Sequence, residues 1–202
     1  MSTRLSFPLT VPPIAILVAL LLVAAAPRRA GAEDLVLTGP HPSLKENALS
    51  LQVLLSAGLG DSSSGHGVGI GYGYMLDGPL WLDLQLNVRG ASSGPLVAGK
   101  PTNTDAIELL GGVTWRFRTP VPLVPYLRMG GGLLYLYPRT GANAAGPVGR
   151  AAAGARYYVF DWLGFTLEGA LSLGHAYLDR DYPGSHNYAV FDAGLGVEWQ
   201  FQ

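Results

Sequence analysis

Apolar and polar residues alternate along eight stretches of this chain, and the stretch that ends at Phe201 shows the pattern most clearly. One face of that stretch is apolar and holds Ala189, Phe191, Ala193, Leu195, Val197, Trp199 and Phe201. The opposite face is small or polar and holds Asp192, Gly194, Gly196, Glu198 and Gln200. A period of two separates the residues in this way, so the pattern predicts β-strands with one apolar face.

The same reading predicts eight strands separated by connections of alternating length. The strands are expected at 48–60, 67–76, 80–89, 106–117, 125–137, 149–159, 164–174 and 189–201. The stretch 149–159 is rich in alanine and would also fit a short helix. Tight turns are expected at 77–79, 119–123 and 161–163, and long connections at 90–104, 138–148 and 175–187, whereas 61–66 is short.

A barrel in a lipid bilayer explains both the alternation and the low charge. Charged residues make up 13% of the chain, about half of the ~25% found in average soluble domains. Hydrocarbon cannot hydrogen-bond to backbone groups, so a sheet that crosses it must close on itself. We therefore predict an all-β fold, an eight-stranded antiparallel up-and-down transmembrane β-barrel over residues 48–202. The alternative is a soluble barrel of lipocalin-like design, whose apolar rows would point inward to a ligand.

The N-terminal residues resemble a secretory signal. Arg4 precedes an apolar run from Ile14 to Ala26, and Ala30-Gly31-Ala32 fits a small-residue cleavage site. The run is shorter than the roughly 17 to 25 residues of a membrane-spanning helix. Residues 1–32 are therefore predicted to be a cleaved signal peptide. Residues 33–47 are predicted to be a periplasmic segment, either a disordered linker or a plug or partner-binding tail.

Composition excludes several kinds of site. The chain has no cysteine, which excludes a disulfide framework, a thiolate metal site and a lipid-modified N-terminal cysteine. Without the predicted signal peptide, acidic residues outnumber basic ones, and no basic stripe suits nucleic acid. We expect no cofactor and no nucleic-acid partner.

Ten charged residues fall on the predicted lumen face, five of each sign. They are Asp83, Glu108, Glu168, Asp192 and Glu198 with Arg89, Arg116, Arg128, Arg150 and Arg156. Unpaired charge in a narrow lumen is costly, and eight strands enclose only enough space for side chains. The balance predicts a network of arginine–carboxylate pairs that fills the lumen, with a narrow polar pore as the alternative.

Aromatic residues gather near the predicted strand ends, where amphipathic rings would lie at the lipid headgroups. The girdle near the tight turns is expected to contain Tyr74, Trp115, Phe117, Trp162, Phe165, Trp199 and Phe201. Tyr177 and Tyr188 are expected in the girdle near the long loops.

One group of residues is a weak candidate for a catalytic site. His175, on the lipid-facing parity, lies near Asp179, Ser185 and His186 in sequence, which would suit a barrel enzyme that modifies lipid A. The same region, with Asp181, could also form a metal site in the loop. The spacing of these residues matches no defined motif. We therefore favour the interpretation that His175 is a solvated loop residue, and we predict no catalytic or metal-binding residues.

The glycine-rich alternating strands, the Pro125-Tyr126 start of one strand and the aromatic last strand 194–201 resemble the small OmpA-like outer-membrane β-barrels. The resemblance covers nearly all of the chain after the signal. It implies location in the outer membrane, contact with its lipid, and a last strand whose Trp199 and Phe201 are recognised by the barrel-insertion machinery, although Gln202 follows. The expected function is a structural or surface-interaction role, with a possible extracellular ligand bound by the long loops.

Overall fold

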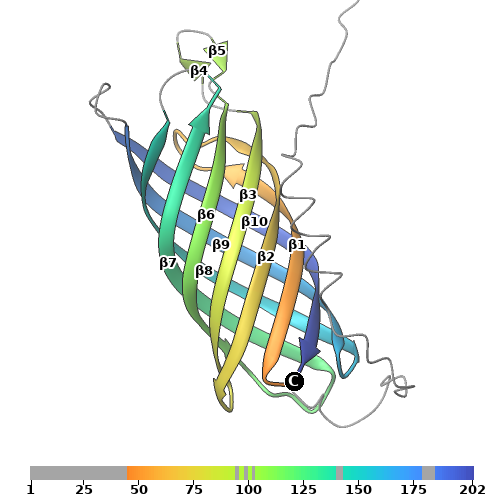
Figure 1. Ribbon diagram of the computed structural model, residues 1–202. Coiled ribbons are helices and arrows are strands. Elements are labelled where there is room, and N and C mark those ends of the chain that lie inside the picture. The colour runs from red at the N-terminus through yellow and green to blue at the C-terminus, as the bar shows by residue number, and fades with distance from the viewer. Residues whose placement is uncertain (1–44, 94–95, 98–99, 102, 140–142, 179–184) are drawn as a thin grey trace, which may run out of the picture. The chain divides into compact units, whose positions relative to one another are not determined.

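The computed structural model describes residues 45–93, 96–97, 100–101, 103–139, 143–178 and 185–202. The predicted signal peptide and most of the 33–47 segment lie outside these residues. Eight strands form one closed antiparallel barrel, in the order β1-β10-β9-β8-β7-β6-β3-β2 (Figure 1). The strands are β1 Asn47–Gly58, β2 Ser64–Asp77, β3 Leu80–Ser93, β6 Thr104–Arg116, β7 Leu123–Pro138, β8 Ala144–Phe160, β9 Leu163–Leu178 and β10 Ser185–Phe201. The predicted fold class is confirmed.

The predicted tight turns are also confirmed, and they lie at one end of the barrel. The β2–β3 turn and the C-terminus share that end, and the small β4–β5 hairpin (Leu96–Val97 and Lys100–Pro101) lies at the other (Figure 1). Gly78 adopts a φ of 50° in the β2–β3 turn, a left-handed conformation that favours glycine. We call the end with the β4–β5 hairpin the outer end.

At the outer end the strands run further than the sequence predicted, so the predicted loops 90–104, 138–148 and 175–187 are too long. Their glycine, proline and serine content suggested loops, but neighbouring strands on both sides supply hydrogen-bond partners that keep the chain extended. Pro147 lies within β8, and the pairing with β9 is interrupted between Ala145 and Val148, where proline has no N–H to offer. In contrast, the first predicted strand was too long, because β1 ends at Gly58.

The two faces of the barrel have opposite chemistry. Leu84, Leu133 and Leu195 are 55%, 66% and 64% exposed on the exterior, whereas the predicted lumen arginines are all buried. The soluble alternative with inward apolar rows is therefore wrong. An exposed apolar surface that surrounds a barrel suits hydrocarbon. Within the described ranges, no helix is long and apolar enough to cross a membrane.

Most of the predicted girdle residues lie on the exterior, but Tyr188 does not. Tyr74, Trp115 and Phe165 are exposed near the tight turns, and Tyr177 is exposed near the outer end. Tyr188 is only 7% exposed, because its position has the same parity as the lumen residue Asp192. The expectation that Tyr188 belongs to the outer girdle is therefore wrong.

The orientation of the faces predicts a depth-dependent penalty for charge. Leu84→Arg places a cation in the middle of the apolar exterior and should destabilise the barrel by roughly 2–4 kcal/mol. Leu59→Arg makes the same change at the exposed β1–β2 turn, where the cost should be about 0–1 kcal/mol. Urea unfolding in lipid vesicles measures both values, and equal penalties would contradict the membrane orientation.

Candidate functional site

The lumen contains an ion-paired cluster near the tight turns, centred on Glu198 of β10. The Arg116 Nη1 atom of β6 lies 3.0 Å from Glu198 Oε1, and the Arg156 Nε atom of β8 lies 3.0 Å from Glu198 Oε2. The Tyr158 hydroxyl donates to Glu198 over 2.6 Å. The Arg116 guanidinium also stacks 3.4 Å from the Trp81 ring centroid, a cation–π contact. Strands β6, β8 and β10 therefore meet at one carboxylate, and Trp81 of β3 joins them through Arg116.

A second cluster lies nearer the outer end, around Arg89 of β3. Arg89 is 2.8 Å from Glu108 of β6 and 2.7 Å from Asp192 of β10. Arg150 of β8 also pairs with Asp192, and its Nη2 atom lies 3.3 Å from Glu168 of β9. Because each carboxylate contacts more than one strand, this cluster fixes the strands across the lumen rather than only between neighbours.

Glu168 links the two clusters. It accepts a hydrogen bond of 2.7 Å from the Tyr126 hydroxyl and pairs with Arg128 at 3.3 Å. The Arg128 side chain in turn donates to Thr114 and Gln85. The Arg156 guanidinium of the first cluster lies 4.3 Å from the Tyr126 ring centroid, so a cation–π contact joins the two clusters into one network along the lumen.

All the predicted lumen charges join this network except Asp83. Its side chain lies on the lumen face of β3 and is half-buried, but it has no ion pair among the residues that the structure describes. The nearby guanidinium groups of Arg116 and Arg128 are already paired with Glu198 and Glu168. The lumen is thus filled by buried ion pairs, although the arginines and carboxylates do not pair one to one.

A void of about 10 Å³ lies between Gln85, Arg128 and Arg150, which is no larger than one water molecule. Two of the buried lumen arginines border it.

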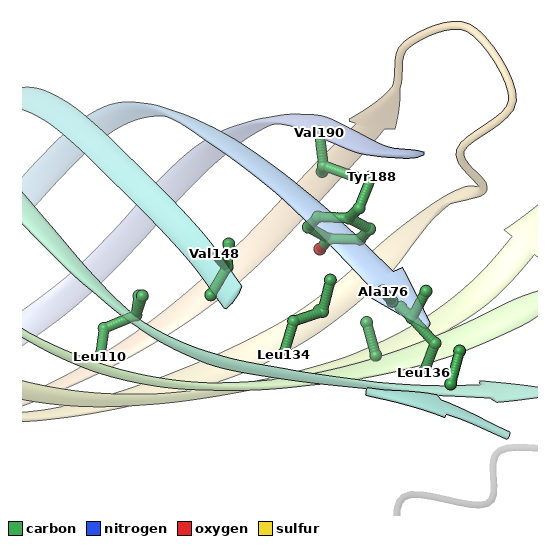
Figure 2. Close-up of a cluster of buried hydrophobic side chains, with 9 residues drawn as sticks. Leu110, Leu134, Leu136, Val148, Ala176, Tyr188 and Val190 are labelled. Carbon is green, nitrogen blue, oxygen red and sulfur yellow. The ribbon is translucent and has the colours of Figure 1, made fainter. Parts of the chain in front are cut away.

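Sequence reasoning missed an apolar cluster in the outer half of the lumen (Figure 2). Its members are Ala106, Leu110, Leu134, Leu136, Ala144, Val148, Ala176, Tyr188 and Val190. They lie at the lumen-facing positions of β6 to β10. The alternation of faces, continued along each strand beyond the charged residues, would have identified them. The lumen is consequently ion-paired along much of its length and apolar on one side of its outer part.

A cavity of about 610 Å³ opens at the outer end, beside this apolar cluster. We call it the outer cup. The β1–β2 turn forms one of its walls and is held by two serines: Ser62 Oγ accepts from the Ala189 N–H at 2.8 Å, and Ser63 Oγ accepts from the Thr104 N–H at 3.1 Å. Ser64 Oγ likewise accepts from the Gly58 N–H at 2.8 Å. The short 61–66 connection is therefore a folded wall of the cup.

The structure does not assemble the candidate catalytic set. His175 of β9 lies on the exterior parity, where its Nδ1 atom is 2.9 Å from Asn187 Oδ1. His186 pairs in register with Ala176, whose side chain is buried, and it lines the outer cup. Both His186 and Ser185 belong to β10 rather than to a loop, and Asp179 and Asp181 lie outside the described residues. The two histidines therefore project from opposite faces of the sheet. Over the residues with assigned positions, no group of three His, Cys, Asp or Glu could hold a metal.

The predicted insertion signal lies at the closing seam of the barrel. Trp199 and Phe201 are half-buried, and their positions in β10 pair with Leu49 and Asn47 of β1. They have the exterior parity of that strand, opposite to the buried Glu198 and Gln200.

Comparisons with known proteins identify the fold. Neisserial surface protein A aligns with a TM-score of 0.64 and 14% identity, over 79% of this chain and 99% of that chain. The N-terminal barrel domain of Pseudomonas aeruginosa OprF aligns with a TM-score of 0.50 and 17% identity, over 78% and 99%. Ail, the attachment invasion locus protein of Yersinia pestis, gives a TM-score of 0.50 and 13% identity, also over 78% and 99%. No family model matches the chain, and no curated protein matches it.

The lumen network predicts a large effect from loss of its central carboxylate. Glu198→Ala leaves the buried guanidinium groups of Arg116 and Arg156 without their partner and should destabilise the barrel by about 3–5 kcal/mol. Asp77→Ala removes an exposed carboxylate at the end of β2 and serves as the control, expected within about 1 kcal/mol of the native chain. Urea unfolding followed by tryptophan fluorescence measures both. A small effect of Glu198→Ala would show that the pairs contribute little.

Proposed function

We propose that this chain is an outer-membrane β-barrel with a structural or surface-interaction role and no catalytic activity. The observation that carries the proposal is the division of the barrel into an apolar exterior and a lumen closed by ion pairs. A closed lumen leaves the outer surface and the connections at the outer end as the parts available to other molecules. The separation of His175 and His186 on opposite faces supports the absence of a histidine-based catalytic site.

The fold neighbours support the same class of role. Neisserial surface protein A is described as a surface protein, and Ail as an attachment invasion locus protein. Because these likenesses are distant, they support the fold, and the role of this chain rests on its own surfaces.

The proposal includes partners during and after assembly. Outer-membrane lipid would cover the apolar exterior, and the barrel-insertion machinery would recognise the β10 strand through Trp199 and Phe201. With an even number of strands, both ends of the barrel chain would lie in the periplasm and the outer cup would face the cell exterior.

Conductance tests the closed lumen. The purified barrel in a planar lipid bilayer should produce no stepwise current, because buried ion pairs fill the lumen. Heat-modifiable migration on a gel confirms that the sample is folded. Regular current steps from the folded barrel would favour the narrow pore instead.

Cysteine labelling tests the orientation, since the chain has no cysteine of its own. Asn143→Cys, exposed between β7 and β8, should react with a membrane-impermeant maleimide on intact cells. Arg118→Cys, exposed in the opposite β6–β7 turn, should react only after the outer membrane is permeabilised. The reverse order of labelling would overturn the proposed topology.

A further inference from the structure

We propose that the outer cup binds an uncharged saccharide. This inference rests on the proposed surface-interaction role and gives that role a site and a class of ligand. The cup volume of about 610 Å³ falls within the roughly 300–1,000 Å³ of small-molecule sites. That space suits a mono- or disaccharide, or the end of a longer glycan.

One wall of the cup is polar and fixed in place. Ser62, Ser63 and Ser64 face it from the β1–β2 turn, and Thr104 lies beside them. Ser62 and Ser64 use their Oγ atoms to accept backbone N–H groups, so the position of each hydroxyl is set before any ligand arrives. Pre-positioned polar groups bind a ligand with little loss of side-chain entropy.

Apolar side chains also line the cup. Leu136 and Pro138 of β7, Ala106 of β6 and Val190 of β10 line it, and the Tyr188 ring continues it toward the lumen. These residues, apart from Pro138, belong to the apolar cluster that fills the outer lumen (Figure 2). A sugar ring has a face of C–H groups and an edge of hydroxyls, so a cup lined by both apolar side chains and hydroxyls offers a contact to each.

The charges around the cup favour an uncharged ligand. Arg89 lies at its floor, but its guanidinium is already bound by Glu108 and Asp192. Asp61 is exposed in the β1–β2 turn, and its carboxylate would repel an anion. Arg89 is the one arginine among the described residues that line the cup, so a sulfated or phosphorylated sugar would meet no uncompensated guanidinium there.

Titration calorimetry tests the proposal with the folded barrel in an amine-oxide detergent, because the sugar headgroups of maltoside detergents would compete. The probes are lactose, maltose and N-acetylglucosamine, with a sulfated heparin disaccharide as the anionic comparison. At least one uncharged sugar should bind. Ala106→Phe should abolish that binding by filling the cup, whereas Ala145→Phe, the same change on the exposed exterior of β8, should leave it unchanged.

A second pair of variants changes only exposed side chains. His186→Ala removes an exposed side chain that lines the cup and should weaken binding about tenfold through loss of polar contact. His66→Ala, the same change on the exposed exterior of β2 and outside the cup lining, should have no effect. Heat-modifiable migration confirms the fold of each variant.

The outcomes separate this inference from the proposed function. Binding of only the sulfated probe, no binding of any probe, or equal binding by the Ala106→Phe and Ala145→Phe variants would overturn the cup as an uncharged-saccharide site. None of these results would change the bilayer conductance or the labelling order, which test the closed barrel and its orientation independently.

Discussion

Closure of the sheet by the β1–β10 ladder determines the rest of this structure. The register runs without interruption from Asn47↔Phe201 to Gly58↔Val190, so no strand edge faces hydrocarbon, where an unpaired backbone group would cost several kcal/mol. Closure also assigns every strand residue to the exterior or to the lumen by its parity. The opposite chemistry of the two faces follows directly from this geometry.

The narrow lumen also limits which polar side chains can be buried inside the barrel. Eight strands enclose a space that side chains fill, and buried guanidinium groups are stable only when carboxylates surround them. Glycines on the lumen face of β2 make room for this packing. A Cβ at Gly73 would lie 3.3 Å from the Trp81 ring and 3.2 Å from Asp83, so a larger residue there would press on the side chains beside the Arg116 stack.

The sequence predicted the fold class, the turns at one end and the lumen position of the ten charged residues, because a period of two is a strong local signal. It could not predict which charges pair. Asp83 was expected to join the network and does not, since pairing depends on which guanidinium groups the barrel brings within reach. The buried position of Tyr188 was also missed, because an aromatic residue near a strand end suits both a girdle and a lumen. The strand extensions at the outer end depend on neighbouring strands, which composition does not reveal.

The ion-paired network and the outer cup meet at Tyr188. Its hydroxyl accepts a hydrogen bond of 3.1 Å from Arg89 of the ion-paired network, while its ring lines the cup. A group bound in the cup would thus rest on a floor that the network holds rigid, rather than on a flexible loop. Because Arg89 is fixed by carboxylates from two other strands, the floor can support binding without opening the lumen. The same buried charges that close the barrel therefore also shape the surface that it presents at its outer end.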